Sequence, residues 1–231
     1  MRLGHSGDGL AIPWMLAGML RFDIMRRTTP FLMNMSRTKD EQLHVQRRED
    51  ILLAAARTFR RKGFHAARTE DICAESGLSA GTVFRYFSSK REIIFEIATR
   101  EYAHYQAQIR VLATRDGVLW LSRLDEAGLN ELLAPSQYDL GSESWLELLR
   151  DPEWRERIIS FEAELRTTLT EAFLTGQREG WIHPALPCEG AAHLLCALMG
   201  GLVIDREIGL TEGQAVIAKT LSRLFRIYFL A

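Results

Sequence analysis

The hydrophobic residues between Gln46 and Gly63 repeat with the period of a helix. The apolar stripe consists of Ile51, Leu52, Ala55, Ala56 and Phe59. Charged residues fill the positions between them, which is the pattern of an amphipathic helix with one face toward a core. Gly63 follows the stripe, and glycine readily adopts the left-handed conformation found just after helix ends. We therefore predict a helix that begins near Gln46 and ends at Gly63.

Two shorter helices are predicted after this one. Thr69 has the hydroxyl of an N-cap, and the two acidic residues that follow it suit the positive end of a helix. Gly77 interrupts the pattern with the permissive backbone that a tight turn needs. Ser79 then caps a third helix, which runs from residue 80 to about residue 87 and turns Val83 inward.

Two short helices joined by a glycine turn, with polar groups on the outer side of the second, form a helix-turn-helix. The second helix of this motif fits the major groove of DNA, where its first residues reach base edges and flanking donors hold phosphates. A helical hairpin without affinity for DNA has the same periodicity. The pattern by itself therefore leaves both alternatives open.

The rest of the chain also has a helical pattern. A long helix is expected from Lys90, followed by helices that proline and glycine separate, near residues 117–134, 142–150, 152–179, 188–208 and 212–230. Strand-like alternation is not seen. The predicted fold class is all-α, with an N-terminal three-helix helix-turn-helix DNA-binding domain at 44–91 and a helical ligand-binding and dimerisation domain at 92–231.

Residues 1–43 are predicted to form a flexible N-terminal extension. Met33 and Met35 lie just before the periodic pattern begins, so residues 1–35 are either a flexible arm or the product of a wrongly assigned start. The apolar run at residues 10–20 imitates a signal peptide, but it lacks a basic flank and a cleavage pattern. Export is therefore not expected.

The segment from Ile51 to Ile93 resembles the DNA-binding head of the TetR-type regulators. It reads ILLAAARTFRRKGFHAARTEDICAESGLSAGTVFRYFSSKREI. The shared features are the spacing of the first helix, the interval from Gly63 to Thr69, the turn at Gly77, the GTVFRYF segment and the Ser-Lys pair after it. They occur in the same order as in the family.

The resemblance implies which residues meet DNA. Ala80, Gly81 and Thr82 would begin the recognition helix and lie nearest to the base edges. Phe84 stands where the family often has a tyrosine. A hydroxyl-to-phosphate bond is therefore missing, and apolar contact with a sugar or a thymine methyl group is what remains.

Further contacts to the phosphate backbone are implied for Thr69, Tyr86 and Lys90. Arg85 is a candidate that we infer from its chemistry, because a guanidinium group can bind guanine O6 and N7 with two hydrogen bonds. The alternative is that Arg85 contacts only a phosphate or an acidic neighbour.

The last two predicted helices are candidates for a dimer interface. The helix at 188–208 is apolar on nearly all sides, and the family joins two such helices from each chain into a four-helix interface. The residues expected there are Leu195, Leu198, Leu202, Leu221, Phe225 and Tyr228. Packing within the core of one chain is the competing interpretation.

Trp120, Trp145 and Phe161 are large aromatic residues that we expect near an apolar pocket between the middle helices. Residues of this kind are also common in an ordinary core. The family resemblance implies a homodimer that binds a palindromic operator as a repressor and is released by a small-molecule effector of unknown identity. A ligand-dependent activator is the alternative within this class.

The composition agrees with a DNA-binding head. The net charge is −1, but residues 36–91 contain twelve Lys or Arg and seven Asp or Glu, and the rest of the chain has the opposite excess. A basic region of this kind suits a polyanion such as double-stranded DNA. A helical scaffold protein without DNA affinity is the rival that this asymmetry disfavours.

Other classes find little support in the sequence. Known catalytic motifs are not found, and the histidines lack the spacing of metal ligands, so no enzyme, cofactor or metal site is predicted. The three cysteines, Cys73, Cys188 and Cys196, have no disulfide or metal spacing, and this pattern is typical of a reducing compartment. We therefore expect a cytoplasmic protein without a membrane span.

Overall fold

The computed structural model describes residues 35–210 and 212–231, with side chains from residue 41 onward. The chain divides into two compact units, residues 1–43 and 44–231, and the features below belong to the second. The predicted extension at 1–43 lies mostly outside the described residues, although helical structure is already present at Met35. The α-helices are α2 (Met35–Lys62), α3 (Thr69–Ser76), α4 (Ala80–Tyr86), α5 (Lys90–Leu112), α6 (Arg115–Leu121), α7 (Glu126–Leu132), α8 (Gly141–Leu148), α9 (Pro152–Glu179), α10 (Cys188–Glu207) and α11 (Gln214–Leu224).

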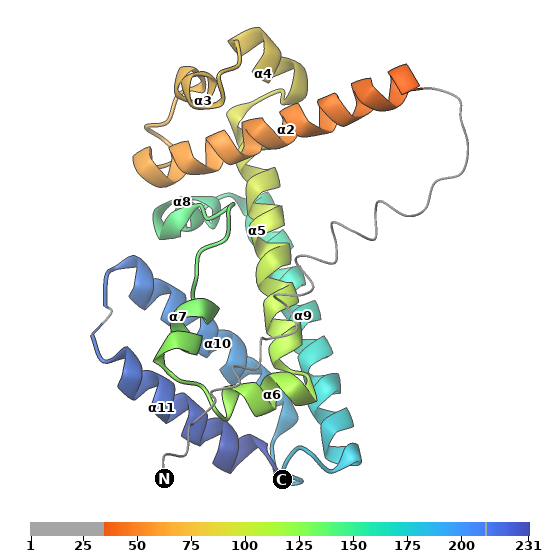
Figure 1. Ribbon diagram of the computed structural model, residues 1–231, viewed down its shortest axis with the longest axis vertical. Coiled ribbons are helices and arrows are strands. Elements are labelled where there is room, and N and C mark those ends of the chain that lie inside the picture. Colours follow the sequence, from red (N-terminus) through yellow and green to blue (C-terminus); the bar gives the residue numbers. More distant parts are fainter. Residues whose placement is uncertain (1–34, 211) are drawn as a thin grey trace, which may run out of the picture. The chain divides into compact units, whose positions relative to one another are not determined.

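Local signals in the sequence set the bounds of the helices around the predicted helix-turn-helix (Figure 1). Gly63 has a φ of 74°, and its N–H donates to the carbonyl of Phe59 at 2.7 Å, which ends α2. Gly77 has a φ of 69° and forms the turn between α3 and α4. The Ser79 hydroxyl accepts a hydrogen bond from the Thr82 amide at 3.2 Å. The predicted three-helix arrangement is therefore confirmed.

The predicted helix at 117–134 is two helices in the structure. α6 ends at Leu121, and α7 begins at Glu126 after Asp125, whose carboxylate accepts from the Gly128 amide at 2.8 Å. An aspartate N-cap is a local signal that the hydrophobic period did not reveal. The predicted last helix also differs, because α11 ends in a π-helical turn, Phe225–Phe229. Among the described residues no strand is formed, only a single antiparallel bridge between Ile182 and Leu230.

Two hydrophobic cores organise residues 44–231. The first core joins α2, α3, α4 and the first half of α5, through buried residues such as Phe59, Val83 and Phe87. Leu148 of α8 and Trp154 of α9 are also buried in it. We call α2 from residue 44, α3 and α4 the head, and α6 to α11 the body, with α5 running through both. The head therefore packs directly on two elements of the body.

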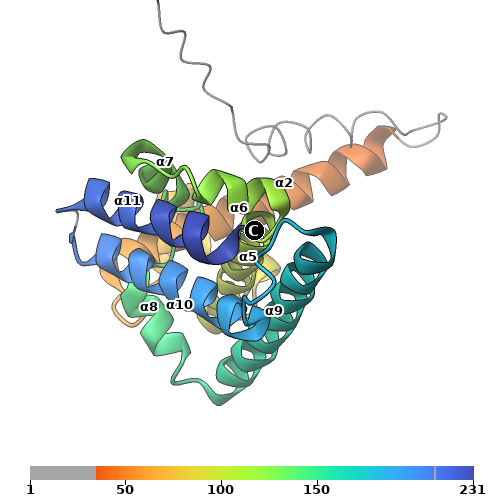
Figure 2. The ribbon, with the colours of Figure 1, turned by 90° about the horizontal axis from the view of Figure 1, so that it is seen from below.

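The second core lies among the body helices. α10 packs against α9, and α11 packs against α7, while α5 contacts both α6 and α9. α10 and α11 lie side by side in both ribbon views (Figures 1 and 2). Within residues 44–210 and 212–231, this arrangement leaves one side of α10 and one side of α11 without a packed helix.

α10 is buried on one face only. Leu195 and Met199 lie in the core, whereas Leu194 and Ile204 are exposed. By length and composition α10 could cross a membrane, with a mean hydropathy of 1.4, and it is alone in this among the described helices. Core helices share that property, so it is weak evidence. The prediction that this helix is apolar on nearly all sides is confirmed. Only 33% of its most apolar 18-residue stretch is buried within the chain, however.

Candidate nucleic-acid interface and effector chamber

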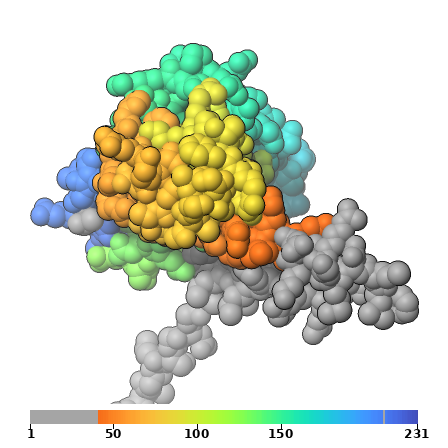
Figure 3. Space-filling model, turned by 90° about the horizontal axis from the view of Figure 1, so that it is seen from above, coloured from red at the N-terminus to blue at the C-terminus, as the bar shows by residue number. Residues whose placement is uncertain are grey.

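The outer surface of α4 is exposed at the end of the head (Figure 3). Its buried side consists of Val83 and the following Phe87, which hold the helix against α2. The predicted DNA contacts that lie fully on the exposed side are Ala80, Gly81, Phe84 and Arg85. Phe84 is 53% exposed, which is unusual for a large aromatic side chain and leaves its ring free for apolar contact.

Arg85 is exposed in the last turn of α4. Its guanidinium carbon lies 5.5 Å from the centre of the Tyr86 ring. No carboxylate forms an ion pair with it among residues 41–210 and 212–231. The acidic-neighbour alternative therefore finds no support, and base contact and phosphate contact remain.

Thr82 and Tyr86 are half-buried, with part of each side chain at the surface. The Thr82 hydroxyl lies 2.9 Å from the Ser79 hydroxyl and so takes part in the cap of α4. The Tyr86 ring packs on the His44 ring with centroids 4.5 Å apart. No described residue hydrogen-bonds to the Tyr86 hydroxyl. Both side chains are therefore oriented by the head itself.

Lys90, which is predicted to contact a phosphate, also has partners within the protein. Its ammonium group donates to the carbonyls of Phe64 at 2.6 Å and Ala67 at 3.0 Å, and to that of His65 at 3.4 Å. It also lies 4.4 Å from the centre of the Phe64 ring. Burial lowers the pKa of Lys90. The side chain ties the start of α5 to the turn between α2 and α3.

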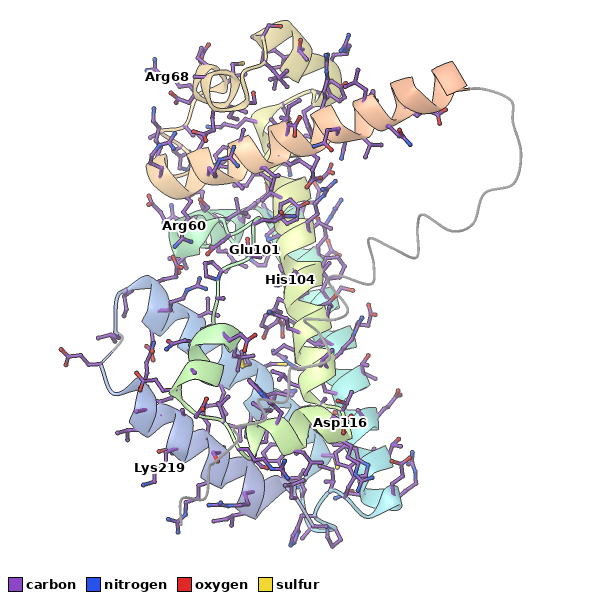
Figure 4. The ribbon with its side chains drawn as sticks, in the orientation of Figure 1. Arg60, Arg68, Glu101, His104, Asp116 and Lys219 are labelled. Atoms are coloured by element: carbon purple, nitrogen blue, oxygen red, sulfur yellow. The ribbon has the colours of Figure 1, made fainter. Side chains whose placement is uncertain are left out.

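Thr69 is the first residue of α3, so the prediction that it caps this helix is wrong. The cap position belongs to Arg68, whose backbone N–H donates to the Asp71 carboxylate at 2.9 Å. The Asp71 carboxylate thus accepts the hydrogen bond at the start of α3, the role that was predicted for the Thr69 hydroxyl. Thr69 remains partly exposed at the head surface, beside Arg68 (Figure 4).

Most of the basic charge of the head is neutralised inside the protein. The pairs that form within the head or along α5 and α9 are Arg48–Glu96, Arg57–Glu75, Arg61–Glu75, Lys62–Asp71 and Arg91–Asp151. In the described side chains of the head, Arg47, Arg68 and Arg85 have no such ion pair. Sequence reasoning did not single out Arg47 and Arg68, because the acids that neutralise the other basic residues come mainly from other helices.

A cavity of about 840 Å³ lies in the body, between α5, α8, α9 and α10. We call it the effector chamber. Its walls are largely apolar and include Leu132, Leu133, Leu146, Ile158, Met199 and Val203. A volume of this size is typical of sites for small organic molecules.

One of the three predicted pocket aromatics lines the chamber. Trp145 of α8 belongs to its wall. Trp120 packs against the core between the lower body helices, and Phe161 stacks on Tyr102 with centroids 5.5 Å apart, outside the lining. The sequence did not separate these roles, because a linear pattern does not show which helices meet around a cavity.

The chamber contains an acidic group that sequence reasoning missed, Glu101 of α5 (Figure 4). One carboxylate oxygen accepts from the Trp145 indole N–H at 3.0 Å and from the Leu140 amide at 3.2 Å. Burial, with a smaller effect of the nearby Asp139 charge, raises the pKa of Glu101 to about 8. The chamber therefore holds a carboxyl group close to its titration point at neutral pH.

Residues of the chamber wall also hold the head. Asp139 and Arg206 line the chamber, and an Arg206 nitrogen donates to an Asp139 oxygen at 3.1 Å. The same Asp139 oxygen lies 2.6 Å from a guanidinium nitrogen of Arg60, in the last turn of α2. Arg60 also pairs with Glu207, the last residue of α10, at 3.1 Å. A molecule that displaced this wall would act on the end of α2.

The predicted dimer residues are divided between the core and the surface. Leu195, Leu202, Leu221 and Phe225 are buried within this chain, as the competing interpretation expected. Leu198 is half-buried, and Tyr228 is 45% exposed. The exposed apolar residues of these two helices and the turn between them are Leu194, Ile204, Ile208, Leu210 and Val216. The hydrophobic period did not show which side of each helix faces outward.

Comparisons with known proteins agree with the geometry of the head. Residues 51–97 match the family model described as bacterial regulatory proteins, tetR family. The HTH-type transcriptional regulator YfiR of Bacillus subtilis strain 168 is 28% identical over 190 residues, which cover 76% of this chain and 90% of YfiR. UidR of Escherichia coli strain K12, also an HTH-type regulator, is 26% identical over 75% of this chain and 88% of UidR.

A solved structure supports the fold over most of the described chain. A putative transcriptional regulator from Saccharomonospora viridis, in complex with choline, has a TM-score of 0.62 and 24% identity, covering 81% of this chain and 99% of that one. The fold and the exposed α4 surface thus define a transcriptional regulator with a helix-turn-helix. Residues 51–97 thus form a DNA-binding head of the tetR family, and about three quarters of the chain is similar to HTH-type transcriptional regulators.

Proposed function

We propose that this protein is a ligand-responsive repressor that binds a palindromic operator as a homodimer in the cytoplasm and leaves it when a small molecule fills the effector chamber. The proposal rests on the observation that Asp139 and Arg206 belong to the chamber wall and also to the group of ion pairs that holds the head. Both line the chamber, and Asp139 pairs with Arg60 of the head. Because a ligand shifts an equilibrium by its differential affinity for two states, a chamber wall that also holds the head gives it a route to DNA affinity.

DNA recognition is proposed to centre on α4. Arg85 supports it, since this exposed guanidinium has no carboxylate partner among the described side chains. Ala80 and Gly81 have small side chains at the start of α4, which would let its backbone approach the groove closely. Arg47 and Arg68 are added as phosphate contacts, because in the described part of the head they form no ion pair.

Dimerisation is proposed through the outer sides of α10 and α11. Leu194 and Val216 are exposed there, and exposed apolar residues of this kind can mark interaction sites. Gly201 lies on the same side of α10, where an added Cβ would meet nothing within 4 Å in this chain. Two heads in one molecule would read two half-sites about one DNA turn apart. A single short helix contacts too few base pairs for such selectivity.

The effector is proposed to be a small organic molecule. The choline complex of the Saccharomonospora viridis regulator supports this class of ligand for a protein of similar fold. The chamber of about 840 Å³ has room for an apolar body larger than choline. The alternative is a ligand-dependent activator. It would use the same chamber and the same DNA-binding head, but the bound ligand would raise its affinity for DNA.

The test has three steps. First, sites bound by the purified protein are selected from random duplex DNA, and inverted repeats are expected among them. Second, a library of small organic molecules is screened for release from the selected site. Third, a reporter under the operator is compared with and without the regulator gene. Higher expression without the gene supports a repressor, and lower expression contradicts it. A protein that selects no sequence at low salt would remove the DNA-binding proposal.

A further inference from the structure

Glu101 lies at the centre of an unusual arrangement in the chamber. Both hydrogen bonds that it accepts, from the Leu140 amide and the Trp145 indole, go to the same oxygen. The other oxygen has no partner among the described residues. A carboxylate in an apolar cavity loses its hydration, and that loss is costly unless a cation or further donors replace the water.

Glu101 is also the acidic group of the chamber without a basic partner. Asp139 pairs with Arg206 at 3.1 Å, and Glu162 pairs with Arg166 at 3.2 Å. No Lys, Arg or His in the described part of the chain lies within 4.0 Å of the Glu101 carboxylate. The two arginines of the wall therefore have their own acids, and Glu101, once ionised, is the lining carboxylate without an ion pair among the described residues.

Aromatic and apolar groups surround this carboxyl group. Trp145 donates to it, and Tyr105 lies one helical turn after it on α5, with Tyr102 beside Tyr105 at a centroid distance of 5.7 Å. All three rings line the chamber. Aromatic faces attract organic cations through their quadrupole, and the attraction is strongest where water is excluded. The remaining walls are mainly aliphatic.

We infer that the effector chamber takes an organic cation, with its ammonium group against Glu101 and the rings of Tyr105 and Trp145 and its apolar body along the aliphatic walls. This inference rests on the ligand-responsive function proposed above and names the chemical class of the effector. An anion would be repelled by the ionised carboxyl group, and an uncharged molecule could give it a hydrogen bond but no opposite charge.

Binding of such a cation is coupled to release of a proton. Burial raises the pKa of Glu101 to about 8, so the empty chamber holds much of this group protonated at neutral pH, and a bound ammonium favours the carboxylate. The nearby Asp139 charge raises this pKa, while Arg206 lowers it. The other titratable groups that line the chamber are His104, Tyr102, Tyr105, Glu162, Arg166, His193 and Cys196. Burial lowers the pKa of His104, so this ring adds little positive charge at neutral pH.

The experiment uses three probes with the same six-carbon chain and different charge, hexylammonium, 1-hexanol and hexanoate. Calorimetric titration of the full-length protein at pH 8 is expected to give at least tenfold tighter binding of hexylammonium than of 1-hexanol. Glu101→Gln keeps an acceptor for Trp145 and Leu140 but removes the charge. It is expected to abolish the preference for hexylammonium and leave 1-hexanol unchanged.

The matched control is Glu164→Gln. Glu164 is an exposed carboxylate on α9 that pairs with Arg110 at 3.4 Å and does not line the chamber. This variant is expected to bind all three probes as the wild type does. Hexylammonium binding to the wild type is expected to weaken by about fivefold from pH 8 to pH 7 and by about ninefold from pH 7 to pH 6, as the ionised fraction of Glu101 falls. In Glu101→Gln this pH dependence is expected to disappear.

Two results would overturn the inference. The first is equal or tighter binding of hexanoate or 1-hexanol to the wild type, and the second is hexylammonium binding that Glu101→Gln leaves unchanged. Thermal unfolding of the variant verifies that it is folded. Release of operator DNA is measured in parallel. Release by hexanoate would keep the proposed function and remove the cationic ligand, whereas Glu101-dependent binding without release would keep the cation and remove the proposed control of DNA.

Discussion

A guanidinium nitrogen of Arg60 lies 2.6 Å from a carboxylate oxygen of Asp139. The first residue belongs to the last turn of α2, just before the turn that leads into α3, and the second belongs to the chamber wall. Asp139 is 9% exposed at its side chain, so solvent screens this pair less than a pair on the open surface. The contact therefore links the chamber to the helix-turn-helix through two side chains.

Arg60→Gln is expected to weaken the coupling between ligand and DNA. The substitution removes the charge that meets Asp139 and Glu207 but touches none of the proposed DNA contacts. The ratio of operator affinities without and with saturating hexylammonium is expected to fall by roughly fivefold, within the usual range of coupling energies. Arg57→Gln is the control, because Arg57 pairs with Glu75 inside the head. An unchanged ratio for Arg60→Gln would show that the route runs elsewhere.

Arg85→Ala is expected to change sequence preference. If the guanidinium reads a guanine, the loss is about 1–3 kcal/mol at one base pair and little at the others. Binding is measured for the variant on a set of single-base operator variants. Arg68→Ala serves as comparison, since a phosphate contact weakens all sequences alike and lowers the salt slope by about one. A uniform loss with Arg85→Ala would assign Arg85 to a phosphate.

Lys90→Met is expected to destabilise the head. The side chain keeps its aliphatic length but loses the ammonium donors to Phe64, Ala67 and His65, which leaves these carbonyls without that partner. The free energy of unfolding is expected to fall by about 1–3 kcal/mol, measured with denaturant. Lys219→Met, at an exposed position on α11, is expected to have little effect. Unchanged stability together with a lower salt slope of DNA binding would return Lys90 to the phosphate role first predicted.

Gly201→Arg is expected to give a folded monomer. The site has open space for a Cβ in this chain, and arginine is a better helix former than glycine. In the proposed dimer, however, the new side chain would separate the two copies of α10. Sedimentation velocity at a concentration where the wild type is dimeric measures the change. Ile159→Arg, at a 63% exposed position on α9, is the control and is expected to stay dimeric.

The stability of the protein is expected to fall as the pH rises from about 4.5 to 8, through Glu101. The native state holds the proton until about pH 8, whereas the unfolded chain releases it near the ordinary pKa of 4.5. Between these values the unfolded chain binds fewer protons, so the free energy of unfolding decreases, by at most about 1.4 kcal/mol per pH unit. Glu101→Gln removes this contribution. The stability difference between variant and wild type is therefore expected to grow over this range, as measured by denaturant unfolding at pH 5, 6, 7 and 8.

The sequence by itself determined the head. Gly63, Gly77 and Ser79 act on their immediate neighbours, and the apolar stripe that begins at Ile51 has a fixed helical period, so local rules were enough to place α3, α4 and the end of α2. The predicted start of α2 near Gln46 was wrong, because the helix already begins at Met35, before the apolar stripe. The order of these signals also identified the family. Two helix caps were not predicted correctly, Asp125 before α7 and Arg68, which holds the cap position of α3 that was assigned to Thr69.

Tertiary structure decided the rest. The partners of Lys90 and the pairing of most basic head residues come from distant segments, and a linear pattern does not contain such contacts. The chamber is lined by residues of α5, α8, α9 and α10, which are far apart in the sequence. Glu101 could not be recognised as a site residue from the sequence, because its partners, Trp145 and the Leu140 amide, lie about 40 residues further along the chain. For the same reason, the sequence showed that α10 is apolar but not which of its sides the chain itself covers.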